Sequence, residues 1–393
     1  MNGAGDVVRV LLIEDSVDDA LLLGEQLRTL AARVEVHRVE NEPQLVAALG
    51  EGGWHLVVSD YRLPRFSGME ALRIVREHNA DLPFIMVSGE IAEAAAVAAM
   101  QAGASDYVMK GSLARLQPAL QRELARRPAR KLVALEPGLR RAVARGEFEV
   151  HYQPQVDLRD GSIPSVEALL RWRSPDRGMV MPADFVPALE GCGLIHEVGR
   201  WILRQAADDR RRWLAMGLEA PRIAVNTSVV QIRAYEFVDV VRQSLGGVGA
   251  SGIDLEITES VLMDDLGACV HKLAALRDLG LRIVIDDFGV GHSCLAYLAR
   301  LPAQALKIDR SFVASMLDET PVAKLVASVI GMARELRLDL VAEGVETEAQ
   351  LGALRAMDCR YVQGYLLGRP LPFDETARLL RPGLATEGLP IAL

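Results

Sequence analysis

The chain has 393 residues and a formal net charge of −9, and half of its residues are hydrophobic. This length suffices for two or three domains that each bury a core, and the composition excludes a largely disordered protein. The negative charge argues against a general affinity for nucleic acid or for anionic membranes.

No segment has the length of a signal sequence or a membrane span. The apolar stretch near the N-terminus covers only Val7–Ile13, and no later run approaches the length of a span. The cysteines show neither CxxC spacing nor the density of a disulfide framework: Cys192, Cys269, Cys294 and Cys359. We therefore expect a cytoplasmic protein with reduced thiols and no membrane insertion.

The first part of the chain alternates strand and helix patterns. The strand-like segments are Val7–Ile13, Arg33–Val39, Leu56–Ser59, Phe84–Ser88 and Asp106–Met109, and amphipathic segments separate them and continue to Arg126. This alternation predicts a doubly wound five-stranded parallel sheet, an α/β domain whose ligands bind at the carboxyl ends of the strands. We place this domain at residues 7–126.

Polar side chains stand at the ends of these strands. Glu14 and Asp15 follow the first, Asp60 the third, Ser88 ends the fourth and Lys110 follows the fifth. Three carboxylates at one sheet edge would repel each other and favour a hard cation such as Mg2+. Asp60 can then attack a phosphoryl donor, while Lys110 and the Ser88 hydroxyl stabilise the phosphoryl oxygens. The alternative is that these residues only form turns at the strand ends. That interpretation would account for Asp60 alone but fits the full set poorly.

This set of residues resembles the receiver domain of two-component response regulators. The resemblance implies that Asp60 accepts phosphate from a cognate histidine kinase. It also implies one Mg2+ at Glu14, Asp15 and Asp60, and a switch formed by Ser88, Tyr107 and Lys110. No helix-turn-helix pattern follows, so direct DNA binding is not expected. A basic, proline-containing segment, Arg126–Lys131, then marks a linker, which we place at residues 127–137.

Beyond the linker, successive strand-like runs carry polar side chains at or near their ends: Glu167, Asn226, Glu256, Asp286 with Asp287, Lys307 and Glu343. An acid in a β-branched run lowers stability unless it has a partner or a function. Several steps of about thirty residues match the length of a strand–helix unit. The pattern predicts a parallel (β/α)8 barrel of the TIM type, at residues 138–385, with its strand ends at one centre.

The side chains at this centre favour particular metals. Their donors are oxygens, with no histidine or cysteine among them, which indicates Mg2+ or Mn2+ and not zinc. Adjacent Asp286 and Asp287 can hold two cations, the layout used for phosphodiester hydrolysis. Lys307 can orient or activate a water, although a strand-end lysine paired with Asp309 is an alternative interpretation.

The ordered motifs resemble those of the EAL family of cyclic-di-GMP phosphodiesterases over about residues 135–380. They are Glu167–Trp172, Val225–Asn226, Glu256–Glu259, Asp286–Gly289, Leu306–Asp309, Ala342–Glu346 and Val362–Tyr365. The resemblance implies hydrolysis of cyclic di-GMP to pGpG with one or two Mg2+ or Mn2+ ions. It also implies a homo-oligomer formed through this domain.

The same resemblance implies a role for each site residue. The metal ligands would be Glu167, Asn226, Glu256, Asp286 and Asp287. Lys307 and Glu343 would handle the nucleophilic water, which makes them catalytic together with Glu167 and Asp287. Leu170, Arg171, Glu346 and Gln363 would contact or fix the substrate, and Glu259 would anchor the loop after Asp287.

That loop departs from the family pattern. Val290, His292 and Cys294 stand where the family usually has threonine, tyrosine and serine. Since the expected metal ligands are intact, we expect reduced or more tightly regulated turnover. The alternative is a weak or silent EAL domain that acts as a cyclic-di-GMP receptor or a protein-interaction module.

Overall fold

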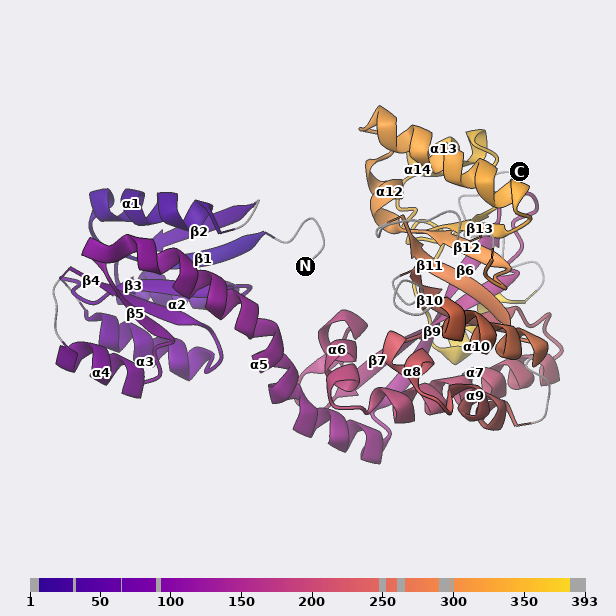
Figure 1. Ribbon diagram of the computed structural model, residues 1–393, viewed down its shortest axis with the longest axis horizontal. Coiled ribbons are helices and arrows are strands. Elements are labelled where there is room, and N and C mark those ends of the chain that lie inside the picture. The colour runs from indigo at the N-terminus through magenta and orange to yellow at the C-terminus, as the bar shows by residue number, and fades with distance from the viewer. Residues whose placement is uncertain are drawn as a thin grey trace. The chain divides into compact units, whose positions relative to one another are not determined.

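The computed structural model describes residues 7–30, 33–64, 66–89, 93–246, 252–259, 266–289, 298 and 300–381. The chain divides after Ala134 into two units, and each has its own sheet (Figure 1). Within the described ranges, no helix is both long enough and apolar enough to cross a membrane.

The N-terminal unit is built on the predicted five-stranded parallel sheet, with strand order β2-β1-β3-β4-β5. The strands are β1 (Val8–Ile13), β2 (Val34–Val39), β3 (Leu56–Asp60), β4 (Phe84–Ser88) and β5 (Asp106–Met109). One face packs against α1 (Val17–Arg28) and the start of α5 (Leu116–Arg145), and the other against α2 (Glu42–Glu51), α3 (Gly68–His78) and α4 (Glu93–Gln101). The strand order reverses between β1 and β3, and ligand sites form at the carboxyl ends of strands beside such a reversal.

The C-terminal unit is a closed barrel of eight strands, which confirms the predicted fold class. In order around the barrel they are β6 (Phe148–Asp157), β7 (Ser165–Ser174), β9 (Arg222–Thr227), β10 (Ile253–Thr258), β11 (Arg282–Phe288), β12 (Ala305–Ile308), β13 (Asp339–Ala342) and β14 (Tyr361–Val362). Pairing of β6 with both β7 and β14 closes the barrel, and β8 (Gly178–Val180) extends β7 at its edge.

The barrel departs from the all-parallel expectation in one strand. β6 runs antiparallel to both of its neighbours, and residues 158–164 join it to β7 without an intervening helix. A connection this short can join only antiparallel strands, because a parallel pair needs a crossover of a dozen or more residues. The reversal pairs the start of β6 with the carboxyl end of β7, and farther along β6 it places Gln153 opposite Glu167.

Helices surround the barrel, and their apolar sides form its outer core. Those within the described ranges are α6 (Pro182–Gly191), α7 (Ile195–Ala215), α8 (Val229–Arg233), α9 (Phe237–Leu245), α10 (Leu266–Asp278), α12 (Arg310–Ser315), α13 (Thr320–Glu335), α14 (Glu348–Ala356) and α15 (Phe373–Leu379).

Ion pairs lie at the end of the barrel where the parallel strands begin and the antiparallel β6 finishes. They join Arg222 to Asp254 at 2.5 Å, Arg360 to Asp157 at 2.7 Å, and Arg282 to Asp339. Charged groups at this end are thus paired with each other, which leaves the carboxyl end as the place for chemistry, as in other barrels of this type.

A single helix carries the chain from the first unit into the second. After β5, a 3-10 segment η1 (Lys110–Arg115) leads directly into α5, which contains all of the predicted linker at residues 127–137. Leu116 and Leu120 lie in the core of the N-terminal unit, whereas Leu135 and Leu139 are buried in the second unit. The proline at 128 therefore does not interrupt the helix, contrary to the break that such a residue usually causes.

Candidate functional site

The barrel strands deliver polar side chains to the barrel interior. Glu167 lies in β7, Asn226 in β9, Glu256 in β10, Asp286 in β11 and Lys307 in β12, while Glu343 follows β13 and Gln363 follows β14. Alternate residues of a strand point to opposite sides. In β10, for example, Leu255 and Ile257 join the outer core and Glu256 faces inward.

Lys307 is the positive centre of this cluster. Its Nζ lies 2.5 Å from Glu343 Oε1, 2.9 Å from Glu256 Oε1, 3.4 Å from Glu167 Oε2 and 3.5 Å from Asp286 Oδ1. Asp309, the alternative partner of Lys307, instead caps α12 by accepting a hydrogen bond from Ser311 N at 3.0 Å. The structure thus favours the interpretation of Lys307 as part of a site.

The cluster holds more negative charge than Lys307 can offset. With Asp287 it contains five carboxylates and one ammonium, an excess of four negative charges when all are ionised. Burial raises the pKa of Glu256 well above its usual value, and it raises the pKa of Glu343 to about 8 even beside Lys307. Burial and the neighbouring Asp286 raise the pKa of Asp287 to about 6.

Several of these atoms have unmet bonding capacity. Among the described residues, neither Glu256 oxygen nor Lys307 Nζ has a hydrogen-bond partner, despite the short ion-pair distance between them. One oxygen from each of Asp286, Asp287 and Glu343 lies within 4.8 Å of the others. Buried oxygens that lack partners and repel one another fit a hard divalent cation such as Mg2+, which prefers oxygen ligands.

Glu167 differs from the other acids because amides hold both of its oxygens. Asn226 Nδ2 and Gln363 Nε2 each donate to it at 2.6 Å. Burial acts to raise the pKa of Glu167, but the charge of Lys307 and these two hydrogen bonds outweigh it and leave the pKa below its usual value. Glu167 is therefore held as a carboxylate.

Two residues of this network were missed by the sequence analysis. Gln155 Nε2 donates to Gln363 Oε1 at 2.9 Å, and Gln363 Nε2 donates to Gln153 Oε1 at 3.2 Å. Both glutamines lie in β6 and orient Gln363 toward Glu167. The available signal was the alternation of polar residues along β6, which puts Gln153 and Gln155 on the same face.

A β-bulge explains how two consecutive aspartates serve one site. The register of β11 against β12 shifts between Ile285 and Phe288, so Asp286 and Asp287 together lie opposite Lys307. Asp287 has a φ of 55°, in the left-handed region, and its N–H donates to Asp286 Oδ1 at 2.9 Å. In a regular strand the two side chains would point to opposite sides, and the bulge removes that alternation.

The segment after Asp287 begins in a tight turn. Gly289 has a φ of 99°, and its N–H donates to Glu259 Oε2 at 3.2 Å. This contact suits the role predicted for Glu259 as an anchor of the loop. Val290, His292 and Cys294 lie outside the described residues.

The predicted substrate contacts are only partly gathered at this site. Arg171 is buried and its Nη1 donates to Leu170 O at 2.9 Å, and burial lowers the pKa of its guanidinium. Leu170 and Asn226 line a mainly apolar cavity of about 430 Å3 bounded by β7, β9, α6 and α7. Glu346 is exposed, and its side chain forms no ion pair or hydrogen bond with the described cluster.

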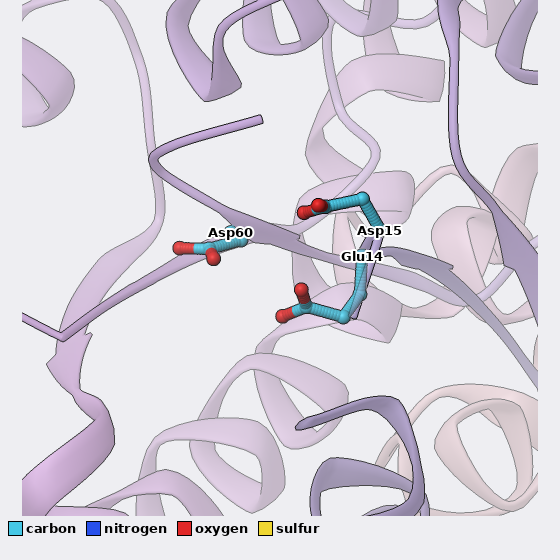
Figure 2. Close-up of side chains that lie close together, drawn as sticks. All are labelled: Glu14, Asp15 and Asp60. Carbon is cyan, nitrogen blue, oxygen red and sulfur yellow. The ribbon is translucent and has the colours of Figure 1, made fainter. Parts of the chain in front are cut away.

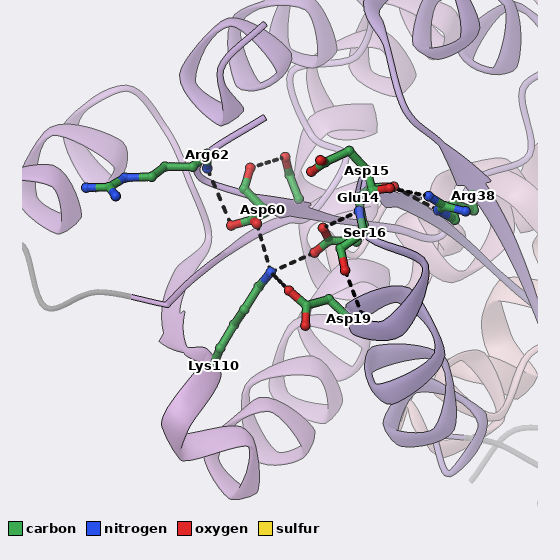
Figure 3. Close-up of polar contacts among 9 residues, drawn as sticks. Glu14, Asp15, Ser16, Asp19, Arg38, Asp60, Arg62 and Lys110 are labelled. Atoms are coloured by element: carbon green, nitrogen blue, oxygen red, sulfur yellow. Dashed lines mark hydrogen bonds and ion pairs between the residues drawn. The ribbon is translucent and has the colours of Figure 1, made fainter. Parts of the chain in front are cut away.

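A second acidic site lies at the carboxyl edge of the N-terminal sheet. Glu14 and Asp15 follow β1 and Asp60 ends β3, and one oxygen from each lies within 4.8 Å of the others (Figure 2). Lys110 Nζ lies 2.8 Å from Asp60 Oδ2 and 2.9 Å from Glu14 Oε2 (Figure 3). The structure thus brings together the carboxylates and the lysine that the sequence predicted.

Asp19 was not predicted to belong to this site. It lies in the first turn of α1, and its Oδ2 is 2.5 Å from Lys110 Nζ (Figure 3). Burial acts to lower the pKa of Lys110, but hydrogen bonds with Asp19, Asp60 and Glu14 outweigh it and hold the pKa above its usual value.

The two remaining switch residues lie on the neighbouring strands. Ser88 is buried at the end of β4, and the register pairs it with Met109, the residue before Lys110. Tyr107 lies in β5 and packs on the core of this unit, and its buried hydroxyl has no hydrogen-bond partner among the described residues.

Comparisons with known proteins agree with both units. The family model described as the EAL domain matches residues 138–370, and that of the response regulator receiver domain matches residues 10–121. The cyclic di-GMP phosphodiesterase NbdA of Pseudomonas aeruginosa is 42% identical over 249 residues, which are 63% of this chain and 32% of NbdA. The bifunctional diguanylate cyclase/cyclic di-GMP phosphodiesterase MucR of the same organism is 42% identical over 63% of this chain and 36% of MucR. The matched region thus spans about a third of the length of these curated relatives.

Solved structures support the same assignment. The PaMucR phosphodiesterase in complex with c-di-GMP matches with a TM-score of 0.60 and 42% identity, over 63% of this chain and 99% of that one. The EAL enzyme Bd1971, with cAMP and cyclic-di-GMP bound, matches with a TM-score of 0.61 and 31% identity, over 69% and 76% of the two chains. The chain belongs to the EAL domain family and carries a response regulator receiver domain ahead of its EAL domain.

Proposed function

We propose that the EAL domain hydrolyses cyclic di-GMP to linear pGpG with Mg2+ or Mn2+, under the control of phosphorylation at Asp60. The observation that carries the proposal is the excess of carboxylates around Lys307. A substrate with two anionic phosphodiesters would be repelled by this cluster unless cations offset the charge. The names of NbdA and of the PaMucR complex support the choice of substrate.

The residues that would hold the metal are oxygen donors: Glu167, Asn226, Glu256, Asp286 and Asp287. When bound, the ions would offset the phosphate charge and lower the pKa of a coordinated water. Glu167 is prepared for this role because its amide contacts keep it ionised.

The remaining polar groups would act on water and substrate. Hydrolysis forms a bond from the water oxygen to phosphorus and breaks the bond from phosphorus to the 3′ oxygen, which gains a proton. The Lys307–Glu343 pair, 2.5 Å apart, is suited to hold and move protons in this step. Arg171 would contact a phosphate, and the apolar cavity beside Leu170 would take a guanine base.

At the receiver, an Asp60 oxygen would form a bond to the phosphorus of a phosphohistidine, and the P–N bond to the kinase histidine would break. Mg2+ at Glu14, Asp15 and Asp60 would offset the charge of the phosphoryl group. Lys110 and Ser88 would contact its oxygens, and Tyr107 would respond to the change.

The test is to incubate the purified protein with cyclic di-GMP and Mg2+ and to follow the products by chromatography. We expect pGpG with Mg2+ or Mn2+ and none with EDTA. Binding of cyclic di-GMP without any pGpG under metal would contradict the proposal and favour the receptor alternative, for which the departures at Val290, His292 and Cys294 are the motivating observation.

A further inference from the structure

Lys110 in the receiver is fully engaged by carboxylates. Its Nζ lies 2.5 Å from Asp19 Oδ2, 2.8 Å from Asp60 Oδ2 and 2.9 Å from Glu14 Oε2 (Figure 3). An ammonium group has three N–H donors, and each of these contacts is a hydrogen bond. No donor is therefore left for a phosphoryl oxygen on Asp60 unless one of the three contacts breaks.

Before Asp60 is modified, the contact of Lys110 with Asp19 is the easiest of the three to break. The side chain of Glu14 is fully buried and that of Asp60 is 12% exposed, whereas that of Asp19 is 40% exposed. Water can replace Lys110 as the partner of an exposed carboxylate at little cost, but it cannot reach a buried one. Asp19 also lies outside the group of three carboxylates suited to Mg2+.

The position of Asp19 does not depend on its own side chain. Its backbone N–H donates to Ser16 Oγ at 3.2 Å, which caps α1. The cap fixes the backbone at the start of the helix, and the carboxylate is free to reach Lys110.

We infer that Asp19 is a positioning residue that restrains Lys110 in the unphosphorylated receiver and thereby weakens binding of a phosphoryl group at Asp60. The inference rests on the proposed role of Asp60 as phosphoacceptor. Lys110 exchanges its contact with Asp19 for a phosphoryl oxygen when Asp60 is modified. Removal of the Asp19 carboxylate leaves one N–H donor of Lys110 available in advance.

The experiment compares beryllofluoride binding by the full-length protein and its variants at saturating Mg2+, followed by 19F NMR. Beryllofluoride mimics a phosphoryl group, and Asp60→Asn identifies the signal that belongs to the receiver. We expect Asp19→Asn to bind beryllofluoride up to about fivefold more tightly than wild type, the upper end of the range for an exposed ion pair. Equal or weaker binding by Asp19→Asn would overturn the inference.

Asp18→Asn is the matched control. Asp18 lies in the same turn of α1, and its substitution by Asn changes the charge by the same amount. Within the described part of the chain, Asp18 forms no ion pair with Lys110. Asp18→Asn and Asp19→Glu should both bind as wild type does. Tighter binding by Asp18→Asn equal to that of Asp19→Asn would show a general charge effect and refute the role of Asp19.

A double-mutant cycle with Lys110→Ala tests whether Asp19 acts through Lys110. In the Lys110→Ala background, Asp19→Asn should leave beryllofluoride binding unchanged, and a persistent gain would contradict the inference. If wild type shows no signal that depends on Asp60, the proposed phosphoacceptor is wrong, which is an outcome distinct from failure of Asp19→Asn alone.

Discussion

Glu167 is the carboxylate of the barrel whose ionised state is best secured. Two amides donate to its oxygens, while Glu256 has no hydrogen-bond partner among the described residues. An acid held ionised in a buried site is ready to bind a cation without first losing a proton. Glu167 and Glu256 are the same residue type, but their different contacts make Glu167 the better prepared of the two to bind a cation.

Glu167→Ala should lower the rate of pGpG formation by more than about a hundredfold. Loss of a metal ligand lowers activity more than loss of a residue that only hydrogen-bonds to a ligand. Glu335→Ala, at the exposed end of α13, is the control and should keep the wild-type rate. Chromatography of the reaction mixture gives both rates. A wild-type rate in Glu167→Ala would show that the metal site is assigned to the wrong residues.

Glu343 should make the stability of the metal-free protein depend on pH. Its pKa is about 8 in the folded protein, against a usual value of 4.5. A carboxyl with a raised pKa adds stability that is full below the usual value and is lost as the pH rises through the folded value. In EDTA, the Tm of wild type relative to Glu343→Gln should therefore fall between pH 5 and pH 8.5.

Thermal unfolding across this pH range measures the effect. Saturating Mg2+ should weaken the pH dependence, because a cation replaces the proton as the partner of the cluster. A Tm difference between wild type and Glu343→Gln that does not change with pH would contradict the raised pKa.

At the scale of elements, the bulge in β11 determines how the barrel presents its paired aspartates. Asp287 adopts a positive φ, which costs an L residue about 1 kcal/mol or more. Such a conformation persists only where the surroundings impose it, and here the register shift against β12 does so. The strained backbone at Asp287 thus allows two consecutive carboxylates to face the barrel interior.

Asp287→Gly should separate stability from activity. Glycine relieves the strain and removes a repelled carboxylate, so the Tm in EDTA should stay the same or rise, while pGpG formation should fall sharply. Asp286→Gly is the control, because it places glycine at a position without positive φ and should lower the Tm. Equal losses of Tm in the two variants would show that Asp287 is not strained.

The turn that carries Gln363 depends on a close approach of two backbones. A Cβ at Gly364 would lie 2.1 Å from Val345 O, so Gly364→Ala must displace Gln363 or its neighbours. We expect it to cost about 1–3 kcal/mol of unfolding free energy and to slow pGpG formation.

Gly352→Ala in α14 is the matched control for Gly364→Ala. A Cβ at Gly352 would meet nothing within 4 Å, and alanine in a helix interior should raise stability by about 0.5–1 kcal/mol. Denaturant unfolding compares the two variants. Similar stability changes would show that the backbone at Gly364 can move apart without cost.

At the scale of the whole molecule, α5 is the element that the receiver and the EAL domain share. Lys110 begins η1, and η1 leads directly into α5, whose two ends contribute buried residues to different units. A change at Asp60 that moves Lys110 therefore acts on the segment from which this helix starts. A shared element of this kind couples two sites when both of them bias its arrangement.

Beryllofluoride should raise the rate of pGpG formation in wild type by about fivefold or more, the lower end of typical coupling free energies. It should have no effect in Asp60→Asn. Three glycines inserted between Ala129 and Arg130 should abolish the response and leave the basal rate unchanged. Equal rates with and without beryllofluoride in wild type would show that Asp60 does not gate the EAL domain.

Much of this protein is determined locally in its sequence. The five strands of the receiver follow from short apolar or alternating segments, and the boundaries predicted for Phe84–Ser88 and Asp106–Met109 are those of β4 and β5. The acids, amides and lysine at the strand ends were recognisable because each stands out against its apolar neighbours. Site residues that stand at the end of an apolar strand could thus be identified from the sequence alone.

Tertiary structure decided the features that depend on which strands are neighbours. The direction of β6 brings Gln153 and Gln155 to Gln363, more than 200 residues away in the chain. Lys110 meets Asp19 across 91 residues, and the bulge at Asp287 exists only in the pairing of β11 with β12. A local sequence pattern indicates to which side of a strand a residue points. Strand direction, register and long-range ion pairs are set only when the strands pair in the folded protein.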